Sequence, residues 1–224
     1  VVSCSRKSAA PRRTGATAGG IKMNNGKKAG GTQRMAGLAI FTALIVVLTV
    51  LCTFVKFGPV SITLALAPIV IGAALYGAGA GAYLGFVFSL VVLLTGLFGW
   101  DGGFILMLFD MKWYGLILTV LVKGTAAGYA AGLVYRLLCR KSEKAAVLVA
   151  GIVCPVVNTG LFFAGMALFF MDTLSGMAAS AGQSVIVYMV LGLAGINFVV
   201  ELLVNIALSS GITHIIKSRK RGRA

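Results

Sequence analysis

Long apolar runs separated by short polar breaks make up most of the chain after residue 34. Apolar runs of about 18 or more residues are typical of membrane-spanning helices. The first run covers residues 35–54 and stops before Gly58 and Pro59. The next stays apolar over residues 63–98, too long for one span at about 1.5 Å per residue, and YGAGAGA supplies a turn in its middle.

The whole pattern predicts an all-α polytopic membrane protein with six membrane-spanning helices. Their expected ranges are 35–54, 62–76, 79–98, 114–138, 145–171 and 185–216. Loops are expected at GWDGGFILMLFDMKWYG and at MDTLSGMAASAGQS, before the fourth and sixth spans. The membrane domain is expected over residues 34–217, between a disordered basic tail, 1–33, and a basic tail, 218–224. Met23 is a plausible natural start, which would place residues 1–22 outside the native protein.

The charges support this class and orient the helices. Hydrophobic residues make up 59% of the chain and charged residues 11%, against about 25% charged in a soluble domain. The net charge is +15, and the basic residues gather before residue 35, at 136–144 and after 216. Basic clusters beside spans mark the cytoplasmic side, so both termini are expected to be cytoplasmic. No basic segment has a fold of its own, which disfavours nucleic-acid binding.

Small residues recur at four-residue spacing in three of the expected helices. These residues are Gly77, Gly81 and Gly85, then Gly124, Gly128 and Gly132, and finally Ala39 and Ala43. Such spacing lets helix backbones approach closely within a membrane. The glycines are expected to pack within one bundle. For Ala39 and Ala43, contact with a partner protein is an open alternative.

A few strongly polar residues are expected at membrane depth: Lys123, Asn158, Asn197, Glu201 and Asn205. A charge at the bilayer centre costs about 2.5–3.5 kcal/mol on insertion scales, and such groups usually pair or mark a substrate path. One reading is that Lys123 and Glu201 neutralise each other. The other is that Lys123, Asn158 and Asn197 line a pocket, open to the exterior, for a polar small molecule, anions included. Glu201 would then lie at its floor.

No catalytic, metal-binding or cofactor-binding set is visible in the sequence. The only histidine is His214, and the cysteines show no CxxC spacing. A GxxxxGK[ST] phosphate loop is also missing. An enzyme is therefore not expected, and active transport would need a gradient or an ATP-using partner.

Five segments together resemble the substrate-binding S components of energy-coupling factor (ECF) transporters, over residues 33–217. They are AGLAIFTALIVVLTVL, LAPIVIGAALYGAGAGAYLGFVFSLVVLL, LVKGTAAGYAAGLVYRLL, CPVVNTGLFFAGMALFF and INFVVELLVNIAL. The resemblance implies a vitamin-uptake subunit in a prokaryotic plasma membrane, with both termini cytoplasmic. The vitamin would bind near the outer face, under loops that include Trp100. PVSITLALAPIVIGA and NTGLFF look most similar to the pantothenate-type group, whose substrate carries a carboxylate that Lys123 would hold.

The resemblance also implies partners. A transmembrane coupling subunit would dock on Ala36, Ala39 and Ala43 of the first helix, and two ATPases would drive transport. Lysine at position 123 departs from the arginine of many relatives and lacks its bidentate fork, so a carboxylate would be held less rigidly. Two other readings remain open: a structural or scaffold membrane protein, in which Lys123 and Glu201 form a closed salt bridge, and a stand-alone secondary transporter.

Overall fold

The computed structural model describes residues 26–54, 64–195 and 197–208. All regular secondary structure in these ranges is helical. The elements are α1 (Gly26–Thr53), α2 (Leu66–Tyr76), α3 (Ala78–Leu97), α4 (Phe104–Leu138), α5 (Glu143–Phe169), α6 (Met171–Ser180), α7 (Val185–Val187), the π-helical η1 (Tyr188–Ala194) and a terminal helix, Asn197–Leu208. The expected all-α class is confirmed for this part of the chain.

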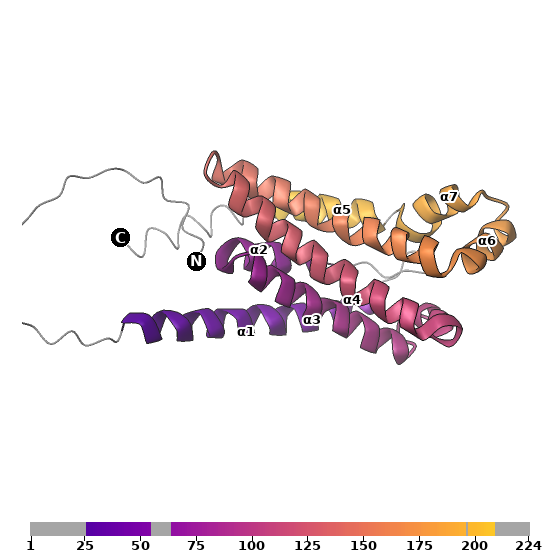
Figure 1. The fold of residues 1–224 in the computed structure, drawn as a ribbon, viewed down its shortest axis with the longest axis horizontal. Coiled ribbons are helices and arrows are strands. Elements are labelled where there is room, and N and C mark those ends of the chain that lie inside the picture. Colours follow the sequence, from indigo (N-terminus) through magenta and orange to yellow (C-terminus); the bar gives the residue numbers. More distant parts are fainter. Residues whose placement is uncertain (1–25, 55–63, 196, 209–224) are drawn as a thin grey trace, which may run out of the picture.

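The helices form one elongated bundle (Figure 1). Helix α4 packs between α3 and α5, and α1 runs along α3 and α2. At one end lies the α4–α5 turn with Arg136, Arg140, Lys141 and Lys144; we call this the basic end. At the other lie α6, α7 and the turn between α3 and α4; we call this the α6 end. Helices α3 and α5 run from the basic end to the α6 end, and α4 runs back.

Fewer helices are long enough to cross a membrane than the six expected. Four qualify by length and composition: residues Gly31–Thr53, α3, α4 and α5. A fifth is reached if the pair Met171–Ser180 and Val185–Leu193, bent by 93°, counts as one span. Helix α2 has 11 residues, about 17 Å at 1.5 Å per residue, against about 30 Å of hydrocarbon. Six spans are therefore not confirmed in the described part of the chain.

Two expected loops contain helices. Helix α6 occupies most of the segment predicted as the loop before the last span. Helix α4 begins at Phe104 rather than at residue 114, and its helical geometry breaks at Lys112 (φ −146°, ψ 80°), so its first part is a separate short helix. The Asp101 carboxylate accepts hydrogen bonds from the backbone N–H groups of Gly103 (3.0 Å) and Ile105 (2.8 Å). An acidic side chain satisfies the free N–H groups of a first helical turn, and this explains the early start.

The terminal tails are only partly described. Helix α1 begins at Gly26, so residues 26–33 are helical where the sequence predicts a disordered tail. Residues 1–25 and 209–224, with His214 and the basic tail 218–224, lie outside the described residues.

The glycine spacing does bring α3 and α4 into backbone contact. A Cβ atom on Gly85 would meet the carbonyl oxygen of Gly124, and one on Gly81 would meet that of Gly128. Side chains at these positions would force the two helices apart. Close packing through these small residues, expected from the sequence, is confirmed.

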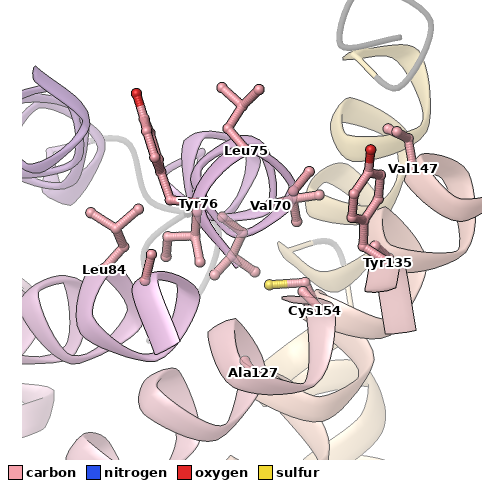
Figure 2. Close-up of a cluster of buried hydrophobic side chains, with 14 of the residues drawn as sticks. Val70, Leu75, Tyr76, Leu84, Ala127, Tyr135, Val147 and Cys154 are labelled. Atoms are coloured by element: carbon pink, nitrogen blue, oxygen red, sulfur yellow. The ribbon is translucent and has the colours of Figure 1, made fainter. Parts of the chain in front are cut away.

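Two buried apolar clusters fill the bundle along its length. The basic-end cluster joins α1–α5 and includes Val70, Leu84, Ala127, Tyr135 and Cys154. Figure 2 shows these side chains from α2, α3, α4 and α5 converging on one another. The α6-end cluster is formed by Leu93, Leu108, Leu116, Val120, Met166, Phe170, Leu174 and Leu193. The level between the two clusters is where the polar residues lie.

Candidate functional site

A polar layer separates the two apolar clusters. On α4, Lys123 falls between Val120 of the α6-end cluster and Ala127 of the basic-end cluster. On α5, Asn158 falls in the same way between Cys154 and Met166. The polar layer comprises Ser89 of α3, Lys123, Asn158, and Asn197 and Glu201 of the terminal helix. Four helices therefore contribute polar groups at one level of the bundle.

Lys123 is partly buried and interacts with two other helices. Its ammonium nitrogen lies 4.7 Å from the centroid of the Phe162 ring on α5. A cation over an aromatic face at this distance is stabilised by about 0.5–2 kcal/mol. The charge of Lys123 also interacts electrostatically with that of Glu201 on the terminal helix. The structure thus brings together the two ionisable groups that the sequence places at membrane depth.

Asn158 is the most informative member of the layer. Its side chain is 6% exposed, and its amide oxygen has no hydrogen-bond partner among the described residues. A buried polar atom without a partner costs about 1–3 kcal/mol. A ligand that donates a hydrogen bond to this oxygen would relieve this cost and gain a net of about 0.5–1.5 kcal/mol. The sequence predicts Asn158 as a substrate-binding residue, and its burial on α5, one helical turn before Phe162, fits that role.

The terminal helix presents a polar stripe to α5. Asn197 and Glu201 are 6% and 4% exposed. One turn further along, Asn205 faces Gly151 of α5. Its amide nitrogen donates to the carbonyl oxygen of Glu201 at 2.8 Å, while its buried amide oxygen has no partner in the described structure. The spacing of four residues explains why all three face the bundle.

The layer is not open toward the α6 end. Leu108, Met166, Leu174 and Leu193 are all fully buried on that side, so apolar packing among the described residues fills the half of the bundle toward the α6 end, where the sequence predicts an open pocket. A cavity of about 640 Å³ lies instead against the other face of α5. Its wall is almost entirely apolar: Val156, Thr159, Gly160, Phe163, Val190, Leu191, Gly195, Phe198, Val199 and Val200. None of the polar-layer residues lines this cavity.

Trp100 lies at the α6 end, in the turn between α3 and α4. Its ring stacks on that of Phe54, with centroids 5.9 Å apart, and it is 46% exposed. The α6-end cluster separates Trp100 from Lys123. The structure therefore places Trp100 at the α6 end of the bundle and not beside the polar layer.

Helix α1 leaves one face uncovered in the described structure. Ala36, Ala39 and Ala43 are all exposed, as are Ile40 (69%) and Val47 (53%). The other side of α1 packs on α2 and α3. The exposed strip is apolar and carries small side chains, which suits close approach by another membrane helix.

Two residues at the site are not predicted from the sequence. Ser89 is fully buried, and its hydroxyl oxygen lies where a side chain on Gly124 would sit. Phe162 is the aromatic partner of Lys123. A serine within an apolar helix usually bonds its own backbone, and one phenylalanine among many carries no signal of its own. Only the packing of the helices distinguishes them.

The fold and the site define a multi-pass membrane protein with a closed polar layer inside a helical bundle. The family model described as "ECF transporter, substrate-specific component" matches residues 33–217. The chain belongs to this family. It is accordingly a membrane-embedded substrate-specific subunit of an ECF transporter and not an enzyme, and the family implies a small-molecule substrate and association with an ECF module. Comparison with curated proteins gives no match.

Proposed function

We propose that this S component binds a vitamin or vitamin precursor in the polar layer and releases it inward, together with a coupling subunit and two ATPases. The buried, unpartnered amide oxygen of Asn158 carries the proposal. A bundle that served only as a scaffold would gain stability from an apolar residue at this position. Lys123, Asn197 and Glu201 would supply the remaining polar contacts, and Trp100 would lie over the entrance.

We propose further that the basic end faces the cytoplasm. Arg136, Arg140, Lys141 and Lys144 lie there, while Asp101 and Asp172 lie at the α6 end. Positively charged residues beside spans favour the cytoplasmic side. The membrane would be the plasma membrane of a prokaryote. With α2, the terminal helix and the residues that flank them counted as crossings, the chain would span six times with both termini inside.

The cargo would enter from the α6 end. Since Leu108 and Leu174 are buried above the polar layer, both the first part of α4 and α6 would have to move to admit it. The break at Lys112 and the positive φ of Gly103 (84°) bound the first part of α4. A compound of the pantothenate type, suggested by the resemblance of the second and fifth spans, is the first candidate cargo. Lys123 would contact its acceptor oxygens.

The coupling subunit would dock on the exposed strip of α1. Ala36, Ala39 and Ala43 share this strip. Small side chains let another helix approach to backbone distance, where dispersion contacts and weak hydrogen bonds replace the hydrophobic drive that lipid does not supply. No part of the cargo site lies on α1, so docking and cargo binding would be separable.

A scaffold function is the second candidate, because Lys123 and Glu201 do interact and the α6-end cluster closes the bundle. Isothermal titration of the purified full-length protein with a vitamin panel separates the two. The proposed function predicts saturable one-to-one binding of one vitamin, weakened at least about tenfold in Asn158→Leu, as expected for loss of a buried hydrogen bond of about 1.5 kcal/mol. The scaffold function predicts no binding by the wild-type protein or by Asn158→Leu.

A further inference from the structure

The polar layer is balanced in charge. Lys123 and Glu201 are the only ionisable Lys, Arg, Asp or Glu side chains at this level of the described structure, one positive and one negative. Lys123 is already engaged with the Phe162 ring, and its charge interacts with Glu201. A second negative charge placed here would have no cation of its own. Burying an uncompensated charge in an apolar interior is strongly unfavourable.

Two buried atoms at the site are hydrogen-bond acceptors without a partner in the described structure, and the buried Ser89 hydroxyl, which can both donate and accept, also lacks one. The amide oxygens of Asn158 and Asn205 are buried without a partner among the described residues. Both asparagines are more than nine-tenths buried. Acceptors of this kind are satisfied by O–H or N–H groups. A carboxylate, which only accepts, would leave them unsatisfied.

We propose that the cargo is uncharged where it contacts the polar layer and carries at least one hydroxyl or N–H group that donates to Asn158. This inference rests on the proposed function. Lys123 then acts as a hydrogen-bond donor to a carbonyl oxygen or ring nitrogen of the cargo, and not as the counter-ion of a carboxylate. Pantothenate would accordingly bind less well than pantothenol, the neutral alcohol of the same shape.

Matched acid and neutral pairs test this directly. Pantothenate and pantothenol, nicotinate and nicotinamide, and biotin and biotin amide are titrated into the full-length protein in lipid nanodiscs. The neutral member of the bound pair is expected to bind at least about tenfold more tightly, the scale of one unbalanced charge. Equal or tighter binding of the acid overturns the inference. If none of the six compounds binds but a vitamin of the wider panel does, the charge of that vitamin decides: an anionic cargo overturns the inference, while the proposed function survives.

Substitution of Glu201 gives the sharpest control. Glu201→Gln keeps the size of the side chain and removes its charge, so the layer becomes positive and the preference is expected to invert toward the acid. The double variant Lys123→Gln, Glu201→Gln restores balance and is expected to prefer the neutral compound again. If the single variant fails to fold, the double variant still tests whether charge balance sets the preference. Preference for the acid in a layer without charges would contradict the inference.

Discussion

The ammonium nitrogen of Lys123 lies 4.7 Å from the centre of the Phe162 ring, across the contact between α4 and α5. The two residues join helices at the level where the apolar packing of the bundle is interrupted. The aromatic face stabilises the cation in a place without bulk water. Lys123 thereby lies on the side of α4 that faces α5, where its charge also interacts with that of Glu201.

Replacing the Phe162 ring should destabilise the protein because Lys123 loses its cation–π contact. Phe162→Leu is expected to lower the free energy of unfolding by about 0.5–2 kcal/mol beyond the loss of apolar area. Phe163→Leu, the same change one residue on, is the control, because Phe163 lines the apolar cavity and not the lysine. In a Lys123→Met background the extra loss should vanish. An equal effect of Phe162→Leu with and without the lysine would show that the ring matters only as packing.

The close contact of α3 and α4 should not tolerate a methyl group. Gly85→Ala places a Cβ atom on the carbonyl oxygen of Gly124, and overpacking of this kind costs about 1–3 kcal/mol. Gly79→Ala on the same helix has open space around it and should be neutral or slightly stabilising, because alanine favours helix. Thermal unfolding in detergent compares the two. Equal stability of both variants would mean that the helices are further apart than described.

Bulk on the exposed strip of α1 should block assembly but not cargo binding. Ala39→Trp and Ala43→Trp are expected to abolish co-purification with the coupling subunit, since they remove the close approach of helices. Leu118→Trp, at an exposed position of α4 (53%), is the control. If Ala39→Trp assembles normally, the coupling subunit docks elsewhere.

Trp100 should report the arrival of cargo. It stacks on Phe54 at the α6 end, where the first part of α4 and α6 would have to move. A saturable change in tryptophan fluorescence is expected on titration with the bound vitamin, and Trp100→Phe should abolish most of it. Trp113→Phe should preserve the change. The reverse result would place the entrance beside Trp113 instead.

Much of the bundle is predictable from the sequence, and the reasons are physical. Apolar runs indicate burial in lipid, so the apolar parts of the long helices α1, α3, α4 and α5 are predicted where the structure has them, while the first turns of α1 and α4 are not. The four-residue spacing of Gly81 and Gly85 on α3, and of Gly124 and Gly128 on α4, predicts close approach of helix backbones. The contact between these glycines confirms it. Short helices such as α6 leave no comparable pattern, because short helical segments and polar loops have similar compositions.

The candidate site was only partly predictable. Lys123, Asn158 and Glu201 stand out because polar residues are rare at membrane depth. Their level relative to the apolar clusters depends on how the helices are shifted along one another, which no single helix encodes. Leu108 and Leu174, which close the layer, look like ordinary apolar residues in the sequence.

Native mass spectrometry of the full-length protein, after incubation with an equimolar mixture of vitamins, tests cargo binding in the polar layer most directly. We expect a single small molecule bound at one copy per chain by the wild-type protein, and its loss in Asn158→Leu, whose thermal stability should equal or exceed that of the wild type because an unpartnered buried oxygen has been removed. Retention of the same molecule by Asn158→Leu, or an empty wild-type protein across the whole mixture, would contradict a cargo site in the polar layer.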